Sequence, residues 1–455
     1  MKLRRSLTLF DVALFFVIVC TNLQWVATAA AAGPTSLPVW LIGCAAMFVP
    51  VSVAVMWLSW KYPDEGGMYM WTKRAFGPFA GFMTGWTYWC TNLPYFPALL
   101  YFTAGNALFI SGANPDRLSG SPVYFVAVSL GCFAIATTLN VLGLDIGKWL
   151  TNVGAFSRFA VTFLLIGLGT VAWVKFGPAT RITAQTIRPS LQLKDIIFWS
   201  VIAFAWTGAE SAPLMAGEVK DARRCLPLGL AIAALPIAAI YILGTAAVLA
   251  VVPAAHVSGL YGVMQAIAQV ATAIHVPVLT TVAALLVTMS CLASVGAWLG
   301  AVARIPFVAG IDRYLPDAFG RMHPRWHSPV AAILTQVGIS GIFIVLGQGG
   351  TTVKGAYDVL VSSSVLITMV PFLLLFASAI KLRATPLVAI AASIGLFTTI
   401  SSLILSAFPS PDEPNKPLAV AKIVGFTGFM LGSGAVFYYI GSRRQQALAH
   451  AASIE

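Results

Sequence analysis

The chain has 455 residues, of which 59% are hydrophobic and 9% are charged, and its mean hydropathy is +0.87. A soluble domain of this length exposes much of its surface and carries about a quarter charged residues, so this composition excludes an ordinary water-soluble fold. The formal net charge of +12 does not indicate nucleic-acid binding, because the basic residues do not gather as a nucleic-acid surface requires.

A helix needs about 20 apolar residues to cross the hydrocarbon core of a bilayer. Twelve stretches meet this requirement, separated by short polar segments that hold Pro, Gly and most of the charges. No polar segment is long enough for a soluble domain, so residues 1–455 are predicted to form one all-α transmembrane domain. The predicted spans are 9–32, 38–60, 79–110, 122–142, 149–174, 195–218, 227–252, 277–303, 328–347, 355–381, 386–408 and 418–441.

Most basic residues fall on the same side of this arrangement as the two termini. By the positive-inside rule that side faces the cytoplasm, which predicts a multi-pass protein of the cell membrane with cytoplasmic termini. The segment after the fifth span, with Lys175, Arg181, Arg188 and Lys194, is basic but lies on the other side. The basic residues on the cytoplasmic side are Lys2, Arg4, Arg5, Lys61, Lys73, Arg74, Lys148, Lys220, Arg223, Arg224, Arg304, Arg313, Arg321, Arg325, Lys381, Arg383, Arg443 and Arg444.

The first span also has the pattern of a secretory signal. A basic start, Lys2–Arg5, is followed by an apolar run and by Ala27-Thr28-Ala29, a cleavage-site pattern. Removal of this span would leave an odd number of spans, so we expect it to be kept.

The six cysteines are scattered through the hydrophobic spans. They form no C-x-x-C pair and have no metal-ligand spacing, so we expect reduced, buried thiols and neither a metal nor another cofactor.

Two spans are interrupted by polar residues. Cys20-Thr21-Asn22-Leu23-Gln24 divides the first span, and Trp206-Thr207-Gly208-Ala209-Glu210-Ser211 divides the sixth. Interruptions five spans apart predict two inverted repeats, about 9–174 and 195–381, with the substrate near the midplane at unwound helix ends. The remaining spans, about 386–441, would be two extra C-terminal helices. The alternative is that Thr21, Asn22 and Gln24 only bond neighbouring helices.

Several motifs occur in the predicted loops and at the span ends. They are Tyr62-Pro63-Asp64-Glu65-Gly66-Gly67-Met68-Tyr69-Met70-Trp71, Phe76-Gly77-Pro78, Gly81-Phe82, Gly85-Trp86, Ala216–Arg224 with Pro227, Asp312-Arg313-Tyr314-Leu315-Pro316, His323-Pro324-Arg325 and Ser328-Pro329. In order and spacing, over almost the whole chain, they resemble motifs of amino acid–polyamine–organocation (APC) transporters. This resemblance implies the LeuT-like fold, with five-plus-five inverted repeats and broken helices 1 and 6, and the function of a bacterial permease or antiporter.

The break in the first span departs from the family pattern. Many members have a Gly-Ser-Gly-like sequence there, whereas Cys20–Gln24 is more similar to the plant-type polyamine importers and the glutamate/GABA antiporter branch. Side chains in place of glycine leave fewer bare backbone N–H groups, which weakens the case for binding an α-carboxylate.

Ionisable groups within a membrane are costly and are functional candidates by default. Glu210 follows the break in the sixth span, where the resemblance implies an acid that takes part in substrate gating or proton coupling. Arg158 lies in the fifth span, where sodium-independent relatives often have a Lys in place of a bound sodium ion, so it argues against sodium coupling. The alternatives are a permanently paired or helix-capping Glu210 and an Arg158 that reaches the interface.

Three further groups have weaker assignments. Glu218 is predicted to form a structural ion pair beside Lys220 or an inner gate. Ser290 and Ser294 lie near the position of a second sodium site in sodium-coupled relatives, but helix-to-helix bonding is the favoured explanation for them. Residues 256–275 form an amphipathic segment that either packs over the outer vestibule or is a plain loop helix.

Aromatic residues surround the sixth-span break. By the resemblance, Phe204, Trp298 and Asn92 match positions that cover the substrate and hold its distal cationic group, and cation–π contact suits an amine. Polyamine importers have an acid at the position of Asn92, so the amide disfavours a polyamine. Ordinary membrane packing is the alternative for the aromatic side chains. The complete predicted substrate-binding set is Cys20, Thr21, Asn22, Gln24, Asn92, Phe204, Trp206, Thr207, Gly208 and Trp298, and the coupling or gating set is Arg158, Glu210 and Glu218.

The leading hypothesis is a sodium-independent secondary transporter of an amino acid, cationic or amine-bearing, that works by alternating access with proton coupling or exchange. The alternatives are a polyamine importer of the same fold and a membrane amino acid sensor. An enzyme is not expected, because the chain has no H-E-x-x-H, no G-x-S-x-G and no paired intramembrane Asp. The expected partners are a small-molecule substrate and the lipid bilayer; the sequence predicts no oligomeric state.

Overall fold

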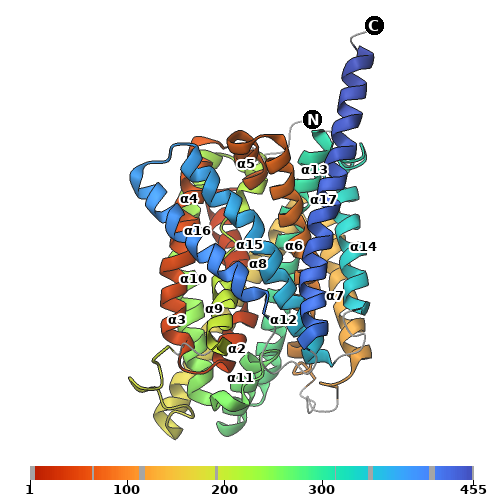
Figure 1. The fold of residues 1–455 in the computed structure, drawn as a ribbon. Coiled ribbons are helices and arrows are strands. Elements are labelled where there is room, and N and C mark those ends of the chain that lie inside the picture. The colour runs from red at the N-terminus through yellow and green to blue at the C-terminus, as the bar shows by residue number, and fades with distance from the viewer. Residues whose placement is uncertain are drawn as a thin grey trace.

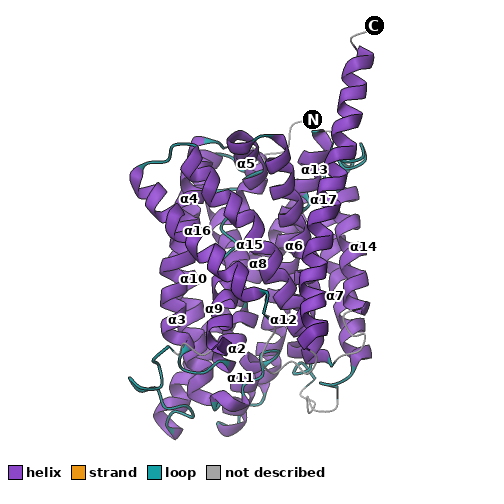
Figure 2. Ribbon diagram, in the orientation of Figure 1, coloured by secondary structure: helices purple, strands orange, loops and turns teal. Residues whose placement is uncertain are grey.

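The structure, a computed structural model, describes residues 6–63, 66–111, 118–189, 193–312, 314–346, 352–408 and 416–452. Lys2, Arg4, Arg5, Asp64, Glu65 and Arg313, which belong to the predicted basic side or to the loop motifs, lie outside the described residues. The described chain is built of helices (Figures 1 and 2), and it also contains an isolated parallel bridge between Leu7 and Val219. The predicted all-α class is confirmed.

The helices follow the predicted spans closely. Their bounds are α1 Leu9–Cys20, α2 Leu23–Ala31, α3 Ser36–Gly43, η1 Cys44–Phe48, α4 Val49–Lys61, α5 Met68–Phe76, α6 Pro78–Ala107, α7 Pro122–Val141, α8 Leu144–Phe176, α9 Leu193–Ala205, η3 Ala212–Glu218, α10 Ala222–Val251, η4 Ala254–His256, α11 Gly262–Ala273, α12 Val278–Val302, α13 Arg304–Ile311, α14 Val330–Leu346, α15 Val353–Lys381, α16 Pro386–Ser406 and α17 Lys416–Ala452.

Within the described residues, nine helical stretches are long and apolar enough to cross a membrane. They are α1 with α2, α3 through α4, α7, α8, α10, α12 with α13, α15, α16 and α17. The other three predicted spans fall on α6, on α9 with η3, and on the 17-residue α14. The count of twelve spans therefore stays a prediction.

The broken first span lies at the centre of the bundle. In its most apolar stretch 89% of the residues are buried, against 22% in the corresponding stretch of α17. Large apolar side chains on other helices point outward, including Val123, Phe163 and Leu235, each more than 70% exposed. A surface of this kind suits lipid rather than water.

Both predicted interruptions are confirmed. α1 ends at Cys20 and α2 begins at Leu23, so Thr21 and Asn22 are non-helical. α9 ends at Ala205, and the chain resumes as the 3-10 turn η3 at Ala212. A helix that unwinds inside a membrane must have its free backbone groups satisfied by protein, water or ligand. The fold therefore has two places where unwound backbone needs hydrogen-bond partners, at Thr21-Asn22 and between Ala205 and Ala212.

The two ends of the bundle differ in their loop helices. α5 and α13 lie at the end from which α17 projects, whereas α11 lies at the opposite end (Figure 1). We call these the terminal end and the distal end. The predicted amphipathic segment 256–275 forms η4 and α11, and its buried face packs against α8, α10 and α12. A local cap fixes the start of α1, because Thr8 and Asp11 form a reciprocal capping box.

Candidate functional site

The break in the first span is stabilised by side chains of its own chain. Asn22 Oδ1 accepts the backbone N–H of Gln24 at 3.2 Å and so caps α2. The backbone N–H of Asn22 donates to the Tyr241 hydroxyl at 3.2 Å, and this oxygen lies 3.0 Å from Cys20 O. Polar groups that a bound ligand would otherwise satisfy thus have partners within the protein.

The break in the sixth span is also stabilised by side chains of the protein itself. Gly208 donates its N–H to Glu210 Oε2 at 2.8 Å and to Oε1 at 3.1 Å. Its φ of +123° requires glycine, and an added Cβ would stand 2.7 Å from Val19 O in the first span. The Tyr241 hydroxyl lies 2.9 Å from Ala205 O, so one side chain of α10 joins both breaks.

A cavity of about 380 Å³ lies beside the two breaks, and we call it the central cavity. Phe204 lies edge to face against Trp25 at 5.4 Å between ring centroids, and Tyr95 meets Trp298 in the same way at 5.9 Å. Glu210 Oε1 accepts the Tyr88 hydroxyl at 2.8 Å. The described lining residues are Val19, Trp25, Tyr88, Thr91, Asn92, Tyr95, Phe204, Ala205, Thr207, Glu210, Tyr241, Trp298 and Thr368.

Arg158 is fully buried on α8, next to the first break. Its guanidinium donates to Thr21 O and, at 3.0 Å, to Thr21 Oγ1. It also donates to Ser290 Oγ, to Ser290 O at 3.3 Å and to Ser294 Oγ at 2.8 Å. These partners are all carbonyl or hydroxyl oxygens, the ligand type that hard cations prefer. The guanidinium therefore occupies an oxygen-lined position between α1, α8 and α12.

The comparisons with known proteins identify the family of the chain. The family model for amino acid permeases matches residues 7–440. The chain belongs to the amino acid permease family. An uncharacterized transporter of Legionella pneumophila is 27% identical, with 96% of each chain covered. The putrescine transporter PotE of Escherichia coli is 24% identical, with 88% of each covered.

A solved structure supports the fold of this family member. The crystal structure of MhsT in complex with L-phenylalanine superposes with a TM-score of 0.63 at 14% identity, covering 90% of this chain and all of the other. At this identity the likeness shows the fold alone, which is LeuT-like. The predicted APC resemblance and LeuT-like fold are confirmed, and the family consists of membrane transporters rather than enzymes.

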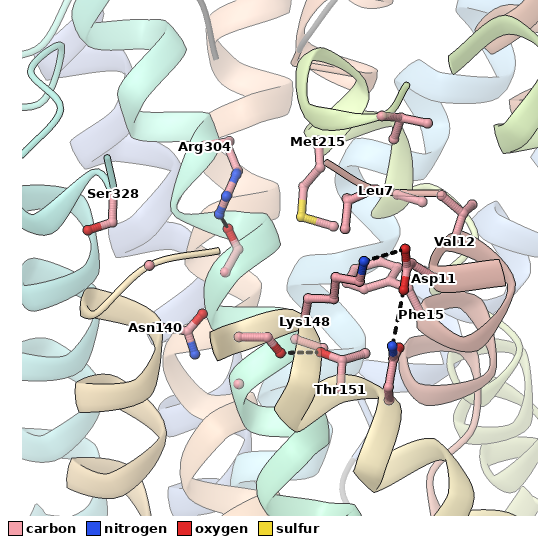
Figure 3. Close-up of a pocket in the computed structure, with 18 of the residues that line it drawn as sticks. Leu7, Asp11, Val12, Phe15, Asn140, Lys148, Thr151, Met215, Arg304 and Ser328 are labelled. Atoms are coloured by element: carbon pink, nitrogen blue, oxygen red, sulfur yellow. Dashed lines mark hydrogen bonds and ion pairs between the residues drawn. The ribbon is translucent and has the colours of Figure 1, made fainter. Parts of the chain in front are cut away.

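Two further cavities of this permease-family chain flank the central one. The terminal cavity, of about 730 Å³, lies where α1, α8, α12 and η3 meet (Figure 3), and Phe15, Thr151, Asn140, Met215 and Arg304 are among its lining residues. The distal vestibule, of about 1520 Å³, lies at the other end between α2, α15 and the loop before α11. Thr28, Tyr357 and Asp358 are among its lining residues.

Charged pairs border the terminal cavity. Lys148 Nζ lies 2.7 Å from Asp11 Oδ2, as a dashed line in Figure 3 shows. Asn152 donates to Asp11 Oδ1 at 3.1 Å. Arg304 binds both carboxylate oxygens of Glu218 at 2.7 and 2.8 Å, with both side chains nearly buried. These pairs join α1 to α8 and η3 to α13.

The structural ion pair expected for Glu218 is present, but its partner is Arg304 and not the neighbouring Lys220. Lys220 follows the end of η3 and is exposed, whereas Glu218 points into the protein, where the bidentate fork of Arg304 meets it. The backbone nearby is also tied down, since Leu7 N–H donates to Glu218 O at 3.1 Å and Lys220 N–H donates to Leu7 O at 3.0 Å. Adjacency in sequence did not predict this partner.

The predicted substrate-binding residues divide into two groups. Asn92, Phe204, Thr207 and Trp298, together with the predicted gating residue Glu210, line the central cavity. The others are not among its described lining residues; they form the breaks or pack behind them, and they are Cys20, Thr21, Asn22, Gln24, Trp206 and Gly208.

Trp206 belongs to an aromatic cluster away from the cavity. Its ring meets Trp40 edge to face at 5.6 Å and Phe48 at 5.1 Å, and its Nε1 donates to Trp40 O at 3.2 Å. Trp40 in turn stacks on Tyr241 at 4.3 Å. This cluster supports the unwound segment from behind.

The sequence analysis missed four aromatic residues of the cavity, namely Trp25, Tyr88, Tyr95 and Tyr241. Tyr88, Asn92 and Tyr95 are spaced i, i+4 and i+7, which places them on one face of α6. This row of polar side chains on an otherwise apolar helix could have identified the face of α6 that lines the cavity. Trp25 and Tyr241 had no comparable signal in a chain with 13 Trp and 12 Tyr.

Proposed function

We propose that this chain is a secondary transporter that holds the ammonium group of a small solute in the central cavity and moves it by alternating access. The inverted repeats, about 9–174 and 195–381, would rock around the two breaks. The single observation that carries the substrate class is the cavity lining: its described residues include one carboxyl, Glu210, several aromatic rings and no Lys, Arg or His. A carboxylate and aromatic faces both attract an ammonium ion.

The hydrogen bonds at the two breaks support recognition of an amine rather than a carboxylate. Backbone N–H groups at unwound helix ends are the natural partners of a substrate carboxylate. Here Asn22 and Glu210 accept N–H groups of Gln24 and Gly208, and Asn22 N–H meets Tyr241. The buried Nε1 of Trp298, without a partner in the described chain, is one remaining donor at the cavity. An amino acid would therefore depend on its amine first.

The family and the relatives support the same range of solutes. The family is named for amino acids, and a relative matched over 88% of each chain is a putrescine transporter. The proposal therefore covers amino acids and their decarboxylated amines, and recognition through the ammonium group is what the two classes share.

Coupling is proposed to be independent of sodium. Arg158 places a fixed positive charge among Thr21 O, Ser290 and Ser294, and a guanidinium does not deprotonate in proteins. A sodium ion at this position would be repelled. Glu210 is the group proposed for proton coupling, because it is buried at the cavity and contacts a break.

The terminal end is proposed to face the cytoplasm of a cell membrane. Lys61, Lys73, Arg74, Lys148 and Arg304 lie in or next to segments at this end, in agreement with the positive-inside rule. The terminal cavity is then the inner part of the path, and the distal vestibule the outer part.

Matched pairs of solutes test the proposal. Purified protein would be melted with ornithine and putrescine and with arginine and agmatine, since a ligand that binds the folded state raises its melting temperature. Uptake of the same solutes into proteoliposomes would follow. At least one amine-bearing member should stabilise the protein and accumulate, and acetylation of its amine should abolish both effects. The proposal fails if no solute binds, or if the acetylated forms bind equally well. Binding without uptake would instead favour a membrane sensor.

A further inference from the structure

A group of polar side chains lies outside the central cavity, on the path toward the distal vestibule. Gln24 is fully buried, yet neither Oε1 nor Nε2 has a hydrogen-bond partner within the described chain. The buried hydroxyl groups of Thr28 and Tyr357 interact only with each other, and neither has a further partner within the described chain. Buried polar atoms without partners cost free energy, so their presence needs an explanation.

Gln24, Thr28 and Tyr357 lie on α2 and α15, which are two helices that line both the central cavity and the distal vestibule. On α2, Trp25 lines the central cavity and Thr28 lines the distal vestibule, while Gln24 and Thr28 are four residues apart on one helix face. On α15, Tyr357 lines the vestibule and Thr368 lines the central cavity. Residues 357 and 368 are eleven apart, which is close to three turns, so they also share a face.

We propose that Gln24, Thr28 and Tyr357 form a second, transient solute-binding step in the outer half of the path. This inference rests on the proposed function and extends it to a new site. The three side chains offer a carbonyl, an amide and two hydroxyl groups to the ammonium of an amine-bearing solute and to its hydration shell. Such a step replaces water contacts that the solute loses when it leaves the vestibule.

The unmet hydrogen bonds of these groups explain why the binding step is transient. In this structure most of their hydrogen-bonding capacity is unused, which destabilises this arrangement relative to one with solute or water present. A solute in the outer half of the path thus offsets an existing cost. Because the groups are neutral, the site does not compete with Glu210 for the ammonium, and the solute passes on to the central cavity.

Isosteric variants separate this role from a structural one. Gln24→Leu removes only polar atoms that have no partner, and Tyr357→Phe removes a hydroxyl that interacts only with Thr28, so the ligand-free melting temperature should not fall. Tyr101→Phe is the matched control, because Tyr101 is also fully buried but donates to Ile344 O at 2.5 Å, so its loss should lower the melting temperature. A lower melting temperature for Tyr357→Phe and Gln24→Leu, together with wild-type uptake, would overturn the proposal.

The transport readout uses the first solute of the matched panel that the wild type accumulates, starting with labelled putrescine. The two variants should slow initial uptake about tenfold, the effect of one hydrogen bond to a charged group. The solute concentration that half-saturates the melting shift should change by less than about twofold, since the central cavity is intact. Unchanged uptake in both variants overturns this inference alone. Lack of uptake by the wild type overturns the proposed function itself.

Discussion

The backbone N–H of Gly208 lies 2.8 Å from Glu210 Oε2 and 3.1 Å from Oε1, so a buried carboxyl group closes the break in the sixth span. The same carboxyl accepts the Tyr88 hydroxyl from α6 and lines the central cavity. A solute that attracts Glu210 therefore acts directly on the backbone of a helix break. This relationship links ligand binding to the conformation of the sixth span.

Replacement of Gly208 should disable the break. Gly208→Ala would place a Cβ 2.7 Å from Val19 O at a φ of +123°, which costs on the order of 1–3 kcal/mol of stability. We expect a lower melting temperature and loss of uptake in proteoliposomes. Gly167→Ala is the control, because a Cβ there meets nothing within 4 Å. Wild-type melting and uptake in Gly208→Ala would contradict the described backbone.

Neutralisation of Glu210 should remove the pH dependence of uptake. In the wild type, protonation of the carboxylate at low pH removes the charge that attracts the ammonium, so uptake should fall as the pH decreases. In Glu210→Gln uptake should be slower but flat with pH, while binding stays measurable by melting. Asp317→Asn, at an exposed ion pair with Arg444, should keep the wild-type profile. A pH profile unchanged in Glu210→Gln would assign Glu210 a purely structural role.

Arg158 should make transport insensitive to sodium. Exchange of sodium for choline should leave wild-type uptake unchanged, because the guanidinium occupies the oxygen-lined position on α8. Arg158→Lys has fewer donors in a different geometry and should lose contacts to Ser290 or Ser294, lowering stability by on the order of 2 kcal/mol. Sodium-dependent uptake by the wild type would refute this assignment.

The Glu218–Arg304 pair can be measured with a double-mutant cycle. Glu218→Gln or Arg304→Gln alone leaves a buried charge without its partner, at a cost of about 3–5 kcal/mol in unfolding free energy. The double variant should recover much of this loss. The exposed pair Asp317–Arg444 is the matched control, and its coupling should be below about 1 kcal/mol. Equal coupling in the two pairs would show that the Glu218 pair is not buried as described.

Much of the fold was predictable because its signals are local. A long apolar stretch predicts a membrane helix whatever its neighbours are, and a polar group such as Thr21-Asn22 or Thr207-Gly208 interrupts that signal at a definite place. Both breaks lie where the sequence analysis placed them. Roles in binding and coupling remain predictions.

The site was predictable only in part, because a side chain's neighbours depend on packing between distant segments. In a membrane protein apolar and aromatic residues face both lipid and protein, so composition alone does not separate Trp206, which packs behind the break, from Trp25, which lines the cavity. The face of α6 with Tyr88 and Tyr95 was visible as a spacing, but its direction was not.

The amino-acid sequence by itself determined that this chain is a helical membrane protein, where two of its spans break and that Arg158, Glu210 and Glu218 lie inside. It did not single out the buried Asp11 and Arg304. Hydropathy and local backbone preference are enough for these features. The tertiary structure alone decided that Glu218 pairs with Arg304, that Tyr241 joins the two breaks and that Arg158 binds Thr21 and Ser290. The partners in each contact are more than 30 residues apart in the chain, so only the packing of the helices brings them within hydrogen-bond distance.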